Sequence, residues 1–224
     1  MIKLGEEIYT SVLTYRFRQE FYASPDSQKD RTVDSINSFF NQWSGKLINL
    51  RMYRSLRYDC DIIFWFSSHD PASIAGFRES LNHSFSGMAE PAYSMFSLYE
   101  HSPYLKAGKR LEDTLRFPPK RYFVAYPMSK TPDWYLIDYD ERKKILAEHI
   151  GMASSHPENQ DIRSYTTYSY GLGDQEFVVL YETDSLAQWS HVTAKLREAT
   201  ARKWIIKEEP IFIGILSEPF AMQR

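Results

Sequence analysis

The chain has 224 residues, of which 43% are hydrophobic and 25% are charged, the balance of a folded globular protein rather than of a disordered or fibrous one. This length suffices for one large domain or for two domains of about 100 residues. Its 27 basic and 29 acidic residues give a formal net charge of −2, and no basic tract is present, so there is no electrostatic case for nucleic-acid binding. Cys60 is the single cysteine, which excludes an internal disulfide and a cysteine-based zinc or iron–sulfur site.

The N-terminal sequence lacks the continuous apolar stretch of a signal peptide, and no run of about 18 apolar residues could span a membrane. We therefore expect a cytoplasmic protein with no membrane contact. Aromatic residues make up 16% of the chain, which fits either thick aromatic cores or an aromatic ligand pocket.

The first part of the chain alternates strand-like and helix-like patterns. Residues 8–17 are β-branched and aromatic, and the apolar residues from Val33 to Trp43 then recur at helical spacing. The predicted order continues with strands at 47–54 and 61–67, a helix opened by Asp70-Pro71 and a strand at 94–99.

A connector at 101–120, rich in proline and charged residues, separates this unit from a second one with the same order. The predicted elements there are a strand at 121–128, a helix at 139–152, strands at 162–170 and 177–182, a helix at 185–202 and a strand at 210–216. The sequence therefore predicts an α+β protein of two ferredoxin-like β-α-β-β-α-β halves, residues 1–110 and 111–224. Their sheets are expected to pack into a dimeric α+β barrel within one chain.

Motifs and isolated histidines leave the function open. The chain has no GxSxG, GxxxxGK[ST], HExxH or GxGxxG sequence. None of its six histidines pairs with another at metal-ligand spacing on one helix, and a lone histidine is usually a surface or core residue. His149 differs because it ends the predicted helix ERKKILAEHIGM, where its imidazole could project into a cavity between helices and sheet.

One series of residues resembles a known family. Tyr126-Pro127-Met128-Ser129-Lys130, followed by Trp134-Tyr135, Glu141-Arg142 and His149, is similar to the YPMSK…WY…ER…H series of the coprohaem decarboxylases, which belong with the chlorite dismutases. Further similarity lies in residues 171–177 and in Leu196-Arg197, and weaker similarity in Tyr93-Ser94 and Arg116-Phe117-Pro118.

The resemblance implies a haem site. His149 corresponds to the axial iron ligand, Lys130 to a lysine near the propionates, and Arg116 and Arg197 to propionate-contacting arginines. Tyr126 corresponds to the tyrosine that relays oxidation from peroxide-activated iron to a substrate propionate. By the residues alone, surface ion pairs are the favoured interpretation for both arginines, and an ordinary place in the core is the default for Tyr126.

The resemblance also implies a reaction in haem biosynthesis, the peroxide-dependent decarboxylation of iron coproporphyrin III to haem b, in a homopentamer. Ser164 stands where chlorite dismutases carry a distal arginine, and strand alternation points the adjacent Arg163 to the other face unless the strand bulges. Chlorite dismutation, which needs that guanidinium, is therefore the less favoured alternative. A non-catalytic haem-binding protein or a haem-free family member is a third interpretation.

Overall fold

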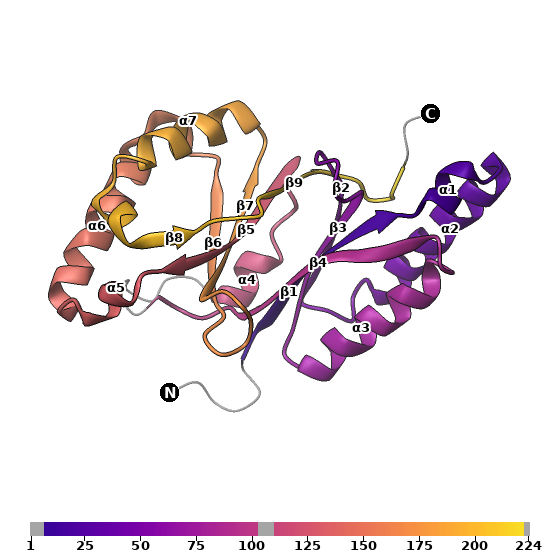
Figure 1. Ribbon diagram of the computed structural model, residues 1–224, viewed down its shortest axis with the longest axis horizontal. Coiled ribbons are helices and arrows are strands. Elements are labelled where there is room, and N and C mark those ends of the chain that lie inside the picture. The colour runs from indigo at the N-terminus through magenta and orange to yellow at the C-terminus, as the bar shows by residue number, and fades with distance from the viewer. Residues whose placement is uncertain (1–6, 103–109, 222–224) are drawn as a thin grey trace.

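The computed structural model describes residues 7–102 and 110–221 (Figure 1). In the N-terminal half the elements follow the predicted order, with one additional short helix after the first strand. They are β1 (Tyr9–Phe17), α1 (Gln19–Ala23), α2 (Asp26–Trp43), β2 (Asn49–Ser55), β3 (Ile62–Ser68), α3 (Pro71–Ser84) and β4 (Ala89–Leu98).

The C-terminal half contains the same core order with several additional short elements. They are α4 (Leu111–Leu115), β5 (Tyr122–Lys130), α5 (Pro132–Leu136), α6 (Tyr139–Ser155), η1 (Pro157–Asn159), β6 (Arg163–Tyr168), β7 (Phe177–Thr183), α7 (Leu186–Leu196), η2 (Thr200–Trp204), β8 (Ile205–Lys207) and β9 (Phe212–Leu216). Helices α4 and α5 and strand β8 lie in segments where the sequence analysis predicted no element.

The strands form one antiparallel sheet in the order β7-β6-β4-β1-β3-β2-β9-β5-β8, and an additional pairing of β5 with β7 closes it into a barrel. The N-terminal strands run β4-β1-β3-β2, and the C-terminal ones run β9-β5-β7-β6, which is the same order. The predicted α+β class is confirmed, and the shared order is consistent with duplicated ferredoxin-like halves. The half boundary at residue 110 stays a prediction, since it borders residues outside the described ranges.

Helices α3, α6 and α7 begin at residues whose side chains cap them, whereas α2 begins after Pro25 without a side-chain cap. Asp70 accepts a hydrogen bond from the Ala72 backbone N–H at 2.9 Å at the start of α3, and Asp138 accepts one from Asp140 at 2.8 Å at the start of α6. Ser185 does the same for α7. Because these oxygens satisfy backbone donors that have no partner inside the helix, the three helix starts are set locally.

Two predicted boundaries differ from the structure by more than a few residues. The helix predicted over 185–202 ends at Leu196, and the chain then turns through η2 into β8. Strand β4 begins at Ala89, earlier than predicted, and continues past Pro91. Pro91 lies where the β1–β4 register shifts at Tyr15, and an irregularity of this kind is where a strand accommodates a proline.

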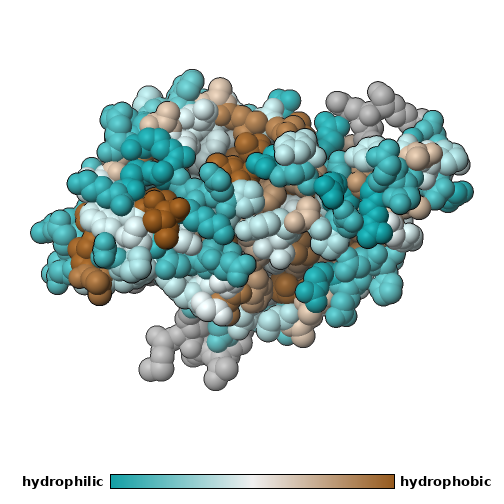
Figure 2. Space-filling model, viewed as in Figure 1, coloured by the Kyte–Doolittle hydropathy of each residue, from teal (hydrophilic) through white to brown (hydrophobic). Residues whose placement is uncertain are grey.

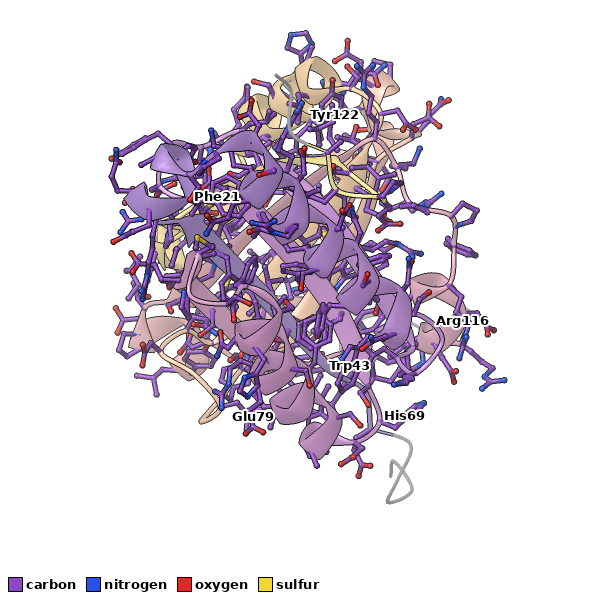
Figure 3. The ribbon with its side chains drawn as sticks, turned by 90° about the vertical axis from the view of Figure 1, so that its right-hand side faces the viewer. Phe21, Trp43, His69, Glu79, Arg116 and Tyr122 are labelled. Carbon is purple, nitrogen blue, oxygen red and sulfur yellow. The ribbon has the colours of Figure 1, made fainter. Side chains whose placement is uncertain are left out.

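Two apolar clusters fill the barrel and the N-terminal helical layer. Helices α1 to α3 cover one side of the sheet and α5 to α7 the other, as Figure 1 shows. Figure 3 looks onto the N-terminal side, where α2 and α3 lie across the sheet. The cluster between these helices and the sheet includes Phe21, Phe39, Phe64, Phe66, Phe77, Ile36 and Leu81. Inside the barrel lie Val12, Tyr53, Ile63, Trp65, Met95, Phe123, Tyr165, Leu180 and Phe212.

Candidate functional site

The C-terminal half is hollow where the N-terminal half is filled. A cavity of about 1140 Å³ lies among β5, β6, β7, α6 and α7. Among the described residues, the buried members of the apolar cluster on this side are Trp134, Ile145 and Ala201. Figure 2 shows a largely hydrophilic surface with separate small groups of hydrophobic residues, some in the middle of the view and some at the left, over the C-terminal helical layer. A cavity of this size is slightly larger than the roughly 300–1,000 Å³ typical of small-molecule sites.

Strand alternation decides which side chains reach the cavity. Phe123 and Ala125 of β5 point into the barrel, so the alternate residues of the strand point toward the helices. The same alternation applies to β6 and β7. The strand side of the cavity is lined by Tyr126, Met128, Lys130, Ser164, Thr166, Tyr168, Phe177, Val179 and Tyr181.

The helix side is formed by single faces of α6 and α7. Most residues of α6 that line the cavity are three or four positions from the next, which places them along one side of the helix. They are Arg142, Leu146, His149, Ile150, Ala153 and Ser154, and α7 with its C-cap adds Trp189, Val192, Thr193, Leu196 and Arg197.

His149 is half-buried and lines the cavity from α6. Its Nδ1 is buried and has no hydrogen-bond partner among the described residues. Burial lowers the pKa of this imidazole, and the positive charges of Lys130 and Arg202 lower it further. The imidazole is therefore neutral at pH 7, the form in which a histidine donates a lone pair to a metal.

Lys130 is buried at the end of β5, with 7% of its surface exposed. Its Nζ lies 3.2 Å from the centroid of the Trp134 ring, and its backbone N–H donates to Glu176 Oε2 at 2.8 Å. Burial lowers the pKa of the ammonium group to about 8, although the Glu176 carboxylate opposes this shift. The lysine thus presents a cation, still largely protonated at pH 7, to the cavity.

Tyr126 lies between the cavity and a second tyrosine on the neighbouring strand. Its ring stacks on that of Tyr181, with the centroids 6.1 Å apart. Burial raises the pKa of Tyr126 well above its ordinary value, and the interactions with Tyr181 and the Glu208 carboxylate raise it further. Its phenol is therefore neutral, with its proton retained.

Arg197 and Arg202 lie at the cavity wall and share one carboxylate. Arg197 pairs with Glu208 Oε2 and Arg202 with Glu208 Oε1, both at 2.5 Å. Arg142 lines the cavity from α6, and its Nε is buried without a partner among the described residues. Together with Lys130, these residues make the cavity rich in cations, which suits a ligand that carries carboxylates.

The cavity contains all but one of the predicted site residues. Tyr126, Lys130, His149, Ser164 and Arg197 line it, whereas Arg116 does not. Arg116 follows α4, pairs with Glu112 at 2.6 Å and points to the outer edge of the molecule (Figure 3). Within this chain Arg116 does not reach the cavity where a propionate would bind. It forms a surface ion pair, which was the alternative interpretation.

Ser164, rather than Arg163, lines the cavity. Arg163 lies on the opposite face of β6, where its guanidinium donates to the Pro118 carbonyl at 2.6 Å and contacts the Glu182 carboxylate at 3.4 Å. The β6–β7 register is regular through this position, so no bulge turns Arg163 around. The strand side of the cavity therefore presents the Ser164 hydroxyl and not the Arg163 guanidinium.

A family model described as "Chlorite dismutase" matches residues 29–217. The chain belongs to the chlorite dismutase family. A coproheme decarboxylase from Mycolicibacterium smegmatis is 26% identical over 231 residues, which cover 96% of this chain and 94% of that protein. A chlorite dismutase from Ideonella dechloratans is 17% identical, covering 93% of this chain and 76% of that protein.

Among solved structures, one provisionally described as a chlorite dismutase is 52% identical to this family member, with a TM-score of 0.90 and 96% of each chain covered. A haem-binding protein from Thermus thermophilus has a TM-score of 0.81 at 15% identity, covering 94% of this chain and 91% of that one. At that identity the likeness shows the fold alone.

The cavity of this family member fits an iron porphyrin. Among the described residues there is no cluster of three or more histidine, cysteine or acidic side chains that could hold a bare metal ion. A porphyrin needs only one ligand from the protein because its four nitrogens hold the iron. His149, neutral and with a buried unpartnered nitrogen, suits that position, and Lys130 and Arg142 suit propionate groups.

Sequence reasoning missed several residues of this site. Arg142 was quoted within the series that resembles the family but was assigned no function, although it lies seven residues before His149, a spacing that places both on one helix face. Arg202 and Glu208 follow the early end of α7, where no periodic pattern indicates which way a side chain points.

No helix in the described part of the chain is long and apolar enough to cross a membrane.

Proposed function

We propose that this protein binds iron coproporphyrin III with His149 as the axial ligand and catalyses the oxidative decarboxylation of two of its propionates by hydrogen peroxide, yielding haem b. One observation carries this proposal: Tyr126, on the strand side, and the neutral His149, on the helix side, line the same cation-rich cavity. The similarity to a coproheme decarboxylase along almost the entire chain supports the same assignment.

The protein's own groups bind and orient the porphyrin. Lys130 and Arg142 would offer positive charges to its carboxylates, and Met128, Val179 and Leu196 are among the apolar side chains of the cavity that would surround it. His149 would hold the iron, which when bound would supply the chemistry that reacts with peroxide.

Tyr126 transmits the oxidation to the propionate. Its phenol can lose an electron and a proton together, and the Tyr181 hydroxyl beside it, itself neutral, passes a proton on only as it releases its own. Each propionate, with one peroxide and one proton, becomes a vinyl group, one carbon dioxide and two water molecules. A neutral phenol is the required starting form, and burial of Tyr126 keeps its pKa high enough to maintain it.

The chlorite alternative is disfavoured by Ser164. A bound oxyanion needs a cation beside it, and this position on the strand side supplies a hydroxyl while the Arg163 guanidinium is held on the other face of β6. A haem carrier would bind the porphyrin without altering it, and would not require a tyrosine. The mass of the porphyrin after peroxide treatment separates these functions.

The decisive experiment is titration of the purified protein with iron coproporphyrin III and with haemin, followed by peroxide and mass analysis of the porphyrin. Stepwise loss of two carboxyl groups is expected from the wild-type protein. Tyr126→Phe should bind the porphyrin normally and leave its mass unchanged. Tyr122→Phe is the matched control, since Tyr122 is on the same strand, four residues away, and outside the cavity lining.

His149 is tested by its absorption signature. His149→Ala should shift the Soret band of the bound iron porphyrin, while His191→Ala, a change at an exposed histidine of α7, should leave the band in place. Binding without any mass loss would reassign the protein to carriage or to chlorite chemistry, and absence of binding to either porphyrin would end the haem proposal.

The assembly of the chain belongs to the same proposal. The family resemblance implies a ring of five copies, in the cytoplasm, and the native mass in solution measures the number of copies. A mass of a single chain of 26.4 kDa would contradict the ring.

A further inference from the structure

A carboxylate of the protein occupies the arginine pair of the cavity. Both oxygens of Glu208 are engaged, one with Arg197 and one with Arg202. The Glu208 side chain is 17% exposed, less than either of its partners, at 45% and 28%. Two guanidinium groups bridged by one carboxylate form the arrangement that a propionate of a porphyrin would otherwise complete.

Glu208 faces the interior of the cavity rather than the solvent. It belongs to the cavity lining, and its negative charge raises the pKa of Tyr126 and of Tyr181 on the strand side. It also acts to raise the pKa of His149 on the helix side. A charge that acts on groups from three different elements lies where a bound porphyrin would meet it.

We propose that Glu208 is a specificity-determining residue, a built-in carboxylate that competes with the carboxylates of the ligand for Arg197 and Arg202. This inference rests on the proposed function, because it concerns how the same cavity distinguishes porphyrins by charge. A porphyrin with four carboxylates must displace Glu208 from the arginines to use all its acid groups. A porphyrin with two carboxylates can place them at Lys130 and Arg142 and leave Glu208 bound.

This competition favours release of the decarboxylated product. The substrate loses two carboxylates in the proposed reaction, and the product therefore no longer competes with Glu208 for Arg197 and Arg202. Glu208 then pairs with both guanidinium groups again, which leaves no unpaired charge behind in a cavity emptied of its ligand. The opposite function, in which Glu208 holds the arginines in place for the ligand, predicts the opposite result when Glu208 is changed.

The test compares wild-type protein with Glu208→Gln, which keeps the shape of the side chain and removes its charge. Metal-free coproporphyrin III, with four carboxylates, and metal-free protoporphyrin IX, with two, are titrated by fluorescence at two salt concentrations. Glu208→Gln should bind coproporphyrin about tenfold more tightly, as loss of one charged competitor predicts, and protoporphyrin less than about threefold more tightly. The gain should shrink at high salt.

Glu198→Gln is the matched control, because Glu198 pairs with Lys195 on the surface, outside the cavity lining, and should change neither affinity. Unchanged or weaker coproporphyrin binding by Glu208→Gln overturns the inference. If wild-type protein binds no porphyrin at all, it is the proposed function that fails. Thermal unfolding of each variant checks that it is folded.

A second measurement does not require Glu208 to be changed. If Glu208 already holds Arg197, then Arg197→Gln in the wild-type background should weaken coproporphyrin binding by less than about threefold. A loss of tenfold or more would show that the ligand uses this arginine without displacing Glu208, and would contradict the competition. In the Glu208→Gln background the same change should remove the whole gain in affinity.

Discussion

The two halves of this protein share the same strand arrangement, but one half is filled with apolar side chains and the other encloses a cavity. Strands β1 and β5 both have nine residues, β3 and β7 both have seven, and their registers match: Leu13 lies opposite Phe64 as Tyr126 lies opposite Val179. The N-terminal pair belongs to the apolar cluster beneath the helices. The C-terminal pair lines the cavity.

The difference arises from side-chain volume and polarity on equivalent faces. The last residue of β1 is Phe17, which stacks on Phe21, whereas the last residue of β5 is Lys130. Helix α2 buries Thr32, Ile36, Phe39 and Phe40, but Ile145 is the buried residue of α6. The filled half supplies apolar burial, and the hollow half retains polar groups that contribute little to stability and make the site.

The largest expected change in the free energy of unfolding comes from comparing two leucine-to-alanine variants, one in each half. Leu81→Ala, in the filled half on α3, should lower the free energy of unfolding by about 3–4 kcal/mol, because it leaves a cavity in a close-packed core. Leu196→Ala, on α7 beside the existing cavity, should cost less than about 1.5 kcal/mol, since fewer contacts are lost. Denaturant unfolding of both variants measures the contrast, and equal costs would refute it.

The buried lysine of the hollow half predicts a pH dependence. The folded-state pKa of Lys130 is lowered to about 8, so the unfolded chain keeps the proton that the folded chain releases. Stability relative to Lys130→Met should therefore rise as the pH increases from about 8 to about 10.5, by up to roughly 3 kcal/mol, and be lowest below that range. Parallel pH profiles for the two proteins would show that this lysine titrates normally.

Filling the cavity with ligand should stabilise the hollow half. Iron coproporphyrin III at a hundred times its dissociation constant should raise the free energy of unfolding by about 2.7 kcal/mol, because it binds the folded state alone. The same concentration should stabilise His149→Ala less, as the axial bond is lost. Thermal unfolding with and without the porphyrin measures this, and an equal effect on both proteins would argue against His149 as the ligand.

The smallest change in stability should come from making the hollow half resemble the filled one. Val179→Phe introduces the residue that Phe64 supplies at the matching register position. Val179 is itself only 3% exposed although it lines the cavity, so the larger ring should lower the free energy of unfolding without ligand by about 1–2 kcal/mol. Porphyrin affinity should nevertheless fall at least about tenfold, because the ring occupies the binding volume. Unimpaired binding would place the porphyrin elsewhere.

Local signals in the sequence were enough to predict the α+β class, the order of the principal elements and the helix starts at Asp70 and Ser185. These depend on alternation, helical spacing and capping, which act between residues close in the chain. The series from Tyr126 to His149 indicated the family, and strand alternation alone predicted that Arg163 points away from Ser164. Such features are determined by neighbours along the chain.

The tertiary structure decided what lies across the space between helices and sheet. Closure of the barrel by β5 and β7, the early end of α7 and the return of the chain through β8 bring Arg202 and Glu208 to Arg197, while Arg116 pairs with Glu112 outside. No local sequence pattern predicts these contacts, because they join residues from separate elements. The same long-range packing left one half filled and the other hollow, since volume is shared between facing elements and not specified by either alone.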